Sequence, residues 1–316
     1  MTTSEKIRLV IIIALILIFL ARKYGWLESW RESRQKKQLE EDRKRQLAER
    51  KDQRKKARQD QETKRIQTAE VLRRGLGMLH QKTLQVAGHD LWYLDSDDGT
   101  QGTPVVLLHG FAGSKENWSN VGNRLAQQGY RVIAPDLPGF GQNERNQNLA
   151  YDVTSQAKRI RALIQQLKLE RFHLVGHSMG GSIAAAISYA ASQDVVSLTL
   201  IEPFGVHVPY QSELDKLLAQ DRNPMVIANP AAYNNLLGFI HHAPVDLPPA
   251  VKKQLAEEAA EHRVFYLKVW KEIREGERAN LLDLLLPEIK NRTLVIQGAE
   301  SQVIHPSTPD IIRSMM

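Results

Sequence analysis

The chain has 316 residues, no cysteine and a formal net charge of +7, a length that allows one large globular domain with an additional segment. The absence of cysteine excludes a disulfide framework and a thiolate catalytic site. Residues 22–60 hold fifteen Lys and Arg against eight Asp and Glu, so this segment alone supplies a net +7. The remainder is close to neutral, which argues against a nucleic-acid-binding body.

The first 26 residues contain an apolar run of thirteen residues, Leu9 to Ala21. A transmembrane helix needs roughly 17–25 residues, but Tyr24, Trp26 and snorkelling basic side chains can extend the span to the interfaces. No small-residue cleavage site follows the run, so residues 1–26 are predicted to form an uncleaved, single-pass membrane anchor. Basic residues are more numerous on its C-terminal side, which predicts a cytoplasmic body; a periplasmic body is the alternative.

Residues 27–77 are predicted to form a charged helical stalk. Residues 28–74 contain neither glycine nor proline, and acid-to-base pairs recur at helical spacing. These pairs are Glu40 with Lys44, Glu41 with Arg45, and Asp52 with Lys56. Apolar residues fall at irregular intervals, so a solvated spacer helix is favoured over a coiled coil.

From Met78 onward, short runs rich in β-branched residues alternate with helical stretches. Strand, helix, strand, helix in this order predicts an α/β fold, with a mostly parallel sheet, right-handed crossovers and helices on both faces. The alternation stops over residues 204–290, which are mostly helical with proline breaks, and resumes at Thr293. We therefore predict a first core part at 78–203, a helical lid at 204–290, and a second core part at 291–316.

A serine lies between glycines where one strand-like run gives way to a helix-like run, in Gly176-His177-Ser178-Met179-Gly180. This G-x-S-x-G pattern, in a strand–turn–helix context, predicts a sharp turn that exposes the serine hydroxyl above the sheet. The turn places that hydroxyl at a helix N-terminus, where the helix dipole favours developing negative charge. Ser178 is therefore the candidate nucleophile.

An acyl-transfer site also needs backbone N–H donors for the oxyanion of its tetrahedral intermediate. The segment HGFAGSKENW follows the central strand, and it offers the N–H of Phe111 beside that of Met179. We interpret His109 as a residue that braces this loop, and Asp136, in PDLPGFGQN, as structural. The pair His241-His242 has no carboxylate near it in the sequence, so no metal site is predicted.

The segments HGFAGSKENW, PDLPGFGQN and GHSMGG occur in this order, and together they resemble the α/β-hydrolase fold family, most of all its bacterial lipases and esterases. The resemblance runs from about Leu84 to the end. It implies hydrolysis of a carboxylic ester, either a small molecule or a lipid, without a cofactor. The reaction would pass through an acyl-serine at Ser178, with Phe111 and Met179 as oxyanion donors. Carbon–carbon bond hydrolysis, thioester cleavage and acyl transfer can use the same serine and stay open.

The family places its catalytic acid in a G-x-x-D pattern after the strand read here as TLVIQG. This chain has Gly298-Ala299-Glu300-Ser301, with serine where the aspartate is expected. Glu300 is the first candidate for the acid. Glu202, at the end of the preceding strand, is the alternative.

The family's histidine follows one further strand, beyond a helix that begins here near Ser307. None of the ten histidines occupies that position, because His305 comes too early and the others precede the acid loop. Two explanations compete. The favoured one is that the final strand and helix, with the histidine, are missing from a truncated enzyme, because the nucleophile turn and oxyanion loop are intact. The alternative is a catalytically inactive binding or scaffold protein.

Overall fold

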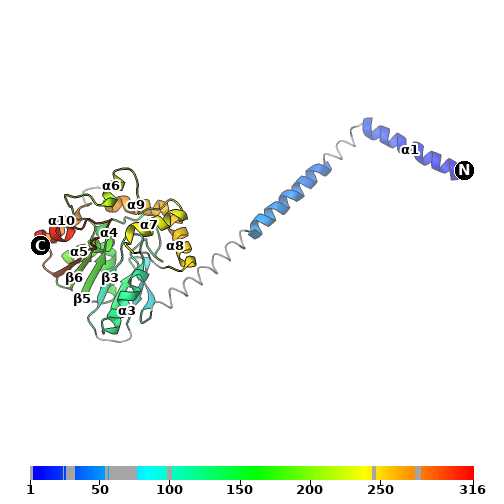
Figure 1. Ribbon diagram of the computed structural model, residues 1–316. Helices are drawn as coiled ribbons and strands as arrows, with labels where there is room; N and C mark the ends of the chain where they lie inside the picture. Colours follow the sequence, from blue (N-terminus) through cyan, green and yellow to red (C-terminus); the bar gives the residue numbers. More distant parts are fainter. Residues whose placement is uncertain are drawn as a thin grey trace. The chain divides into compact units, whose positions relative to one another are not determined.

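The computed structural model describes residues 3–23, 25, 33–53, 56, 77–97, 102–243, 247–274 and 279–316. The chain divides into two compact units, Met1–Gln67 and Thr68–Met316 (Figure 1). Each unit is described by itself.

The first unit is helical where it is described. Helix α1 covers Thr3–Lys23, and residues 33–53 are helical. Residues 27–32, 54–55 and 57–76 of the predicted stalk lie outside the described residues. Two of the expected pairs form, Lys44 with Glu40 at 3.2 Å and Lys56 with Asp52 at 3.1 Å. Exposed pairs at this spacing each contribute only about 0.3–0.5 kcal/mol, so most of the helicity comes from residue propensity.

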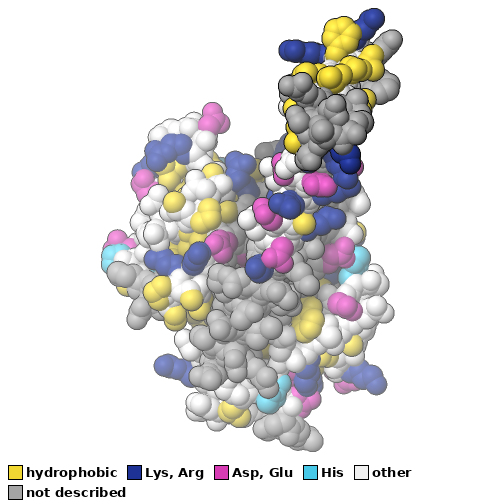
Figure 2. All heavy atoms as spheres, turned by 90° about the vertical axis from the view of Figure 1, so that its right-hand side faces the viewer, with side chains coloured by type: hydrophobic (Ala, Val, Ile, Leu, Met, Phe, Trp, Pro, Cys, Tyr) yellow, Lys and Arg dark blue, Asp and Glu magenta, His cyan; other side chains and the backbone are white. Residues whose placement is uncertain are grey.

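The apolar side chains of α1 are exposed, and they form the yellow surface at the top of Figure 2. Within the described residues, no helix is both long and apolar enough to cross a membrane. The predicted single-pass anchor is therefore not supported. Lys6 precedes the apolar run and Arg22 and Lys23 end the helix, which leaves an uncharged stretch shorter than a bilayer requires. The coiled-coil alternative is not supported either.

The described strands of the second unit form a seven-stranded sheet in the order β1-β2-β4-β3-β5-β6-β7. Strands β3 to β7 pair in parallel, while β1 and β2 form an antiparallel hairpin whose second strand runs antiparallel to β4. The bounds are β1 His80–Val86, β2 His89–Asp95, β3 Val105–Leu108, β4 Val132–Pro135, β5 Phe172–His177, β6 Val195–Ile201 and β7 Arg292–Ile296. The predicted parallel sheet is confirmed for its central strands.

Helices cover both faces of this sheet (Figure 1). All residues of the central strands β3 and β4 are buried, which explains why these strands are continuously apolar and do not alternate. Helices α4 (Val153–Gln166) and α5 (Met179–Ala190) contribute to the larger apolar core, and α3 (Ser119–Gln127) contributes Ala126 to the second. The core thereby fixes the carboxyl ends of β3, β5 and β6, from which the candidate site is built.

The region predicted as a lid contains short helices gathered over one end of the sheet strands (Figure 1). They are α6 Glu213–Leu218, α7 Tyr233–Ile240, α8 Pro249–Glu261, α9 Arg263–Arg274 and α10 Leu281–Leu285. Three short 3₁₀ turns accompany the helices of the body, at Lys115–Trp118, Pro230–Ala232 and Leu286–Glu288. Helix α11, Thr308–Met315, follows β7.

Strand β7 lies at an edge of the sheet, and its Leu294 and Ile296 are 56% and 45% exposed. An edge strand with exposed apolar side chains is a site of aggregation. We expect the double variant Leu294→Lys/Ile296→Thr to aggregate more slowly than the parent chain, as measured by light scattering at rising concentration. Val121→Lys on α3, which removes a side chain that is 48% exposed, is the matched control. An equal effect of the control would show that the edge strand is not the cause.

Candidate active site

Ser178 occupies the turn between β5 and α5 in a strained conformation, with φ of 53° and ψ of −119°. For a residue other than glycine this costs on the order of 1–3 kcal/mol and persists only where surrounding structure fixes it. The fixing contacts come from the end of β6: the Ser178 N–H donates to the Ile201 carbonyl at 2.9 Å, and the Phe204 N–H donates to the Ser178 carbonyl at 3.2 Å. The serine is therefore held at the carboxyl end of the sheet, as the sequence predicts for a nucleophile turn.

The glycines on either side permit α5 to approach the strands closely. A Cβ atom at Gly176 would lie 2.1 Å from the Gly180 carbonyl oxygen. One at Gly180 would lie 2.4 Å from the Leu108 carbonyl oxygen and 2.5 Å from that of His109. All three obstacles are backbone atoms of buried segments, so any side chain at either position would force the helix away from the sheet.

The loop after β3 lies directly against this turn. A Cβ atom built on Gly110 would be 3.2 Å from the Ser178 Cβ and 3.0 Å from the His177 Nδ1. Phe111 comes next, and in the described part of the chain neither its N–H nor that of Met179 donates to a protein acceptor. The two predicted oxyanion donors are thus brought to the same side of the sheet as Ser178 with their N–H groups free.

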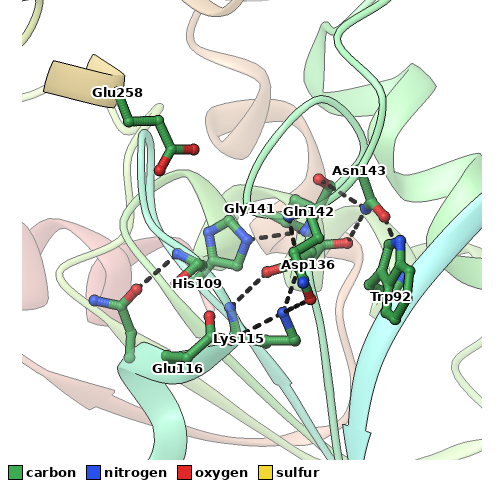
Figure 3. A network of polar contacts seen from close by, with 12 residues as sticks. Trp92, His109, Lys115, Glu116, Asp136, Gly141, Gln142, Asn143 and Glu258 are labelled. Atoms are coloured by element: carbon green, nitrogen blue, oxygen red, sulfur yellow. Dashed lines mark hydrogen bonds and ion pairs between the residues drawn. The ribbon is translucent and has the colours of Figure 1, made fainter. Parts of the chain in front are cut away.

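A buried charge cluster holds the base of this loop (Figure 3). The Lys115 side chain is fully buried, and its Nζ contacts Asp136 Oδ2 and Gln142 Oε1 at 2.8 Å each and Glu116 Oε1 at 2.9 Å. The Lys115 backbone N–H also donates to Asp136 Oδ1 at 2.8 Å. Since a buried charge is tolerated only when it is fully paired, this cluster ties the loop after β3 to the loop after β4.

His109 reinforces the same connection between loops. Its Nε2 accepts a hydrogen bond from the Leu137 N–H at 2.9 Å, and its Nδ1 lies 2.8 Å from the Gly110 carbonyl oxygen. These contacts assign the proton to Nδ1. Burial lowers the pKa of His109, although Asp136 opposes the shift, so the ring is neutral near pH 7. His109 and Asp136 therefore act as structural residues in this arrangement.

Helices α8 and α9 of the lid region pack on the loops of the site. Arg145 pairs with Glu258 of α8 at 2.8 Å and donates to the Gly141 carbonyl at 3.0 Å. The Phe111 ring packs edge-on against Tyr266 and Trp270 of α9, with ring centroids 5.9 and 5.2 Å apart. Aromatic side chains next to the predicted oxyanion donor Phe111 give the site an apolar wall of the kind that suits an acyl chain.

The two candidate acids lie in different environments. Glu202 Oε1 accepts a hydrogen bond from the Gly298 N–H at 2.9 Å, and its Oε2 accepts one from the Ser301 hydroxyl at 3.0 Å. Glu300 is exposed, and no hydrogen bond or ion pair ties it to the described residues. The carboxylate of Glu202 is therefore held by the loop after β7, whereas no described residue holds that of Glu300.

None of the ten histidines, all of which lie in the described residues, forms a hydrogen bond with Ser178. His177 precedes it and is an exposed residue; desolvation by the surrounding protein lowers the pKa of its ring, while Glu202 opposes the shift. His305 stacks on Tyr210, with ring centroids 5.2 Å apart, and contacts the Ser307 hydroxyl through Nδ1 at 2.8 Å. Across the described residues no group of three His, Asp or Glu side chains is arranged to hold a metal ion.

Comparison with known proteins agrees with this architecture. A sequence profile described as the alpha/beta hydrolase fold matches residues 103–314. The chain belongs to the alpha/beta hydrolase fold family. This confirms the resemblance and the α/β-hydrolase fold with its mostly parallel sheet; the predicted anchor is not supported, and the predicted truncation is not confirmed.

Similar members of the alpha/beta hydrolase family are named as lipases. Lipase 3 of Moraxella sp. (strain TA144) is 30% identical over 245 residues, which cover 75% of each chain. Monoacylglycerol lipase ABHD6 of Rattus norvegicus is 29% identical over 251 residues, covering 76% of this chain and 73% of that protein. A crystal structure described as a membrane phospholipase A superposes with a TM-score of 0.77 at 31% identity, covering 80% of this chain and 81% of the other.

The buried cluster yields a direct prediction for this alpha/beta hydrolase. Lys115→Met leaves Asp136 buried without its cation, so we expect a loss of about 3–5 kcal/mol in the free energy of unfolding. Urea denaturation followed by circular dichroism measures this loss. The double variant Lys115→Met/Asp136→Leu removes both charges and should recover much of the stability. A single variant as stable as the parent would contradict the role given to the pair.

Proposed function

We propose that this lipase- and esterase-type hydrolase cleaves carboxylic esters, including ester lipids, through an acyl-serine intermediate at Ser178. The observation that carries the proposal is the conformation of Ser178, a strained backbone held at the carboxyl end of β5 by hydrogen bonds from the neighbouring strand. Structures retain strain of this kind at sites where it serves function. The non-catalytic alternative is not favoured, because similar proteins are named as lipases.

In the proposed reaction the Ser178 Oγ attacks the ester carbonyl carbon and loses its proton to a base. The carbonyl oxygen becomes an oxyanion that accepts hydrogen bonds from the N–H groups of Phe111 and Met179. Such donors are worth about 2.7–4 kcal/mol each in comparable sites. Collapse of the intermediate breaks the bond to the alcohol, which leaves with a proton, and water then releases the acid from Ser178.

The names of similar proteins point to the substrate class. They include a monoacylglycerol lipase and a membrane phospholipase A, enzymes whose names state that they act on lipid esters. The aromatic wall of Phe111, Tyr266 and Trp270 supports an apolar acyl group in the same place. We therefore propose lipid esters with an exposed acyl carbonyl as the substrate class.

The lack of a positioned histidine shapes the test of this proposal. Loss of the histidine from a serine triad lowers turnover by about a millionfold, so steady hydrolysis by this chain should be very slow. With a 4-nitrophenyl ester the 4-nitrophenolate leaves without being protonated, so acylation depends on the base less than deacylation does, and we expect the acyl-enzyme to accumulate. After incubation with 4-nitrophenyl butyrate, peptide mass spectrometry should find a butyryl group on the peptide that carries Ser178.

Ser178→Ala is the control, because the turn is shaped by its glycines and backbone hydrogen bonds and not by the hydroxyl. The variant should keep the melting temperature within a few degrees and lose the butyryl adduct. A butyryl group found on another serine at equal yield, or retained in Ser178→Ala, would contradict the proposed nucleophile.

A further inference from the structure

The turn that carries Glu202 is fixed as firmly as the turn that carries Ser178. Glu202 follows β6 with φ of 45°, a left-handed conformation that is rare for a residue with a long side chain. Its backbone N–H donates to the Ile296 carbonyl of β7 at 2.8 Å. Ile201, directly before it, and Phe204, two residues after it, hold the backbone of Ser178 through the hydrogen bonds described above. Glu202 and Ser178 therefore belong to one hydrogen-bonded unit.

The carboxylate of Glu202 is oriented by the loop after β7. The Gly298 N–H and the Ser301 hydroxyl donate to its two oxygens. A Cβ atom at Gly298 would lie 2.6 Å from Oε1, so glycine there admits the carboxylate to the loop. The Ile304 N–H donates to the Ser301 oxygen at 3.3 Å, which leaves the hydroxyl proton directed at Glu202.

Ser301 stands at the sequence position where the family pattern has its aspartate. A hydroxyl at that position cannot supply a charge, but it receives the longer side chain of Glu202 from the neighbouring strand. The carboxylate expected after β7 is thus present in the same place and comes from the end of β6.

We propose that Glu202 is the catalytic acid of this site, the carboxylate that orients and stabilises the protonated base, and that Ser301 is its positioning residue. This assignment rests on the proposed acyl-serine function. It also predicts that an aspartate at position 301 would harm the site, because two carboxylates would then share one set of donors.

Imidazole in solution can act as the base that this chain does not position, so it provides the test. Imidazole accepts the Ser178 proton as the Oγ–acyl bond forms, 4-nitrophenolate leaves, and the imidazolium is stabilised by the carboxylate. We expect the parent chain to release 4-nitrophenol from 4-nitrophenyl butyrate at a rate that rises with imidazole concentration. The rate with Ser178→Ala gives the background reaction of imidazole itself, and is subtracted.

Variants of Glu202 and Ser301 test the roles proposed for these two residues. A correctly placed carboxylate beside a catalytic imidazole is worth up to about 10⁴-fold in turnover, and we expect Glu202→Gln to lower the imidazole-dependent rate at least about tenfold. Ser301→Ala and Ser301→Asp should also lower the imidazole-dependent rate. Ser301→Thr, which keeps the hydroxyl, should retain the rate of the parent chain. Glu170→Gln, at an exposed position before β5, is the matched control for a charge change.

The pH midpoint of the imidazole-dependent rate distinguishes a catalytic role of Glu202 from a purely structural one, because loss of a structural contact would leave that midpoint unchanged. A carboxylate raises the pKa of a bound imidazole. In Glu202→Gln the midpoint of the imidazole-dependent rate should therefore move to lower pH, while Glu170→Gln leaves it unchanged. Melting temperatures of all variants identify any that fail to fold, and the Ser301 variants then carry the comparison.

The outcomes that overturn the assignment are distinct from failure of the proposed function. A Ser178-dependent rate that survives Glu202→Gln with an unchanged pH midpoint would overturn the role of Glu202. So would loss of that rate in Glu300→Gln with Glu202→Gln unaffected, which would assign the acid to Glu300. Absence of any Ser178-dependent rate, with or without imidazole, would overturn both the proposed function and this assignment.

Discussion

The close approach of helix α5 to strands β3 and β5 is the constraint on which the site depends. At Gly176 and Gly180 a single added carbon would meet backbone oxygens at 2.1 to 2.5 Å. This contact places the first turn of α5 over the carboxyl ends of two neighbouring strands. The strained backbone of Ser178, the free N–H of Met179 and the contact with Gly110 all follow from it. The end of β6 then completes the unit by bonding to Ser178 on both sides and by carrying Glu202.

A second, independent set of contacts holds the loop after β3, which carries Phe111. Before its 3₁₀ turn at Lys115–Trp118, the loop after β3 has one turn, in which the Gly113 N–H donates to the Gly110 carbonyl at 3.1 Å, and side chains tie it to its surroundings. The buried Lys115–Asp136 pair and the His109 ring connect it to the loop after β4. An intact buried ion pair adds little to the free energy of unfolding, but removal of one partner lowers it strongly. The cluster therefore mainly fixes the conformation of the loop. Phe111, between this cluster and the aromatic residues of α9, is thereby held next to Ser178.

Local patterns explain what could be predicted from the sequence. The strand before Ser178 is buried, and the turn after it depends on glycines that are adjacent in the sequence, so both follow from one short segment. Glu202 and Ser301 could not be paired in this way, because they are 99 residues apart and meet only through the order of β6 and β7. The burial of Lys115 could not be predicted from the sequence either, because the sequence Lys-Glu-Asn in a loop is typical of an exposed segment. The anchor was predicted from an apolar run, but charges at both ends of α1 leave that run too short.

The central claim is that Ser178 is a nucleophile whose oxyanion is held by the N–H groups of Phe111 and Met179. The most direct measurement is a crystal structure of the chain after reaction with a 4-nitrophenyl alkylphosphonate in the presence of imidazole, which supplies the base that this chain does not position. The phosphonate forms a stable analogue of the tetrahedral intermediate on the serine. The account predicts phosphorus bonded to the Ser178 Oγ, with one phosphonyl oxygen about 2.7–3.1 Å from both backbone nitrogens. An unmodified Ser178, or a phosphonyl oxygen that points away from both N–H groups, would contradict it.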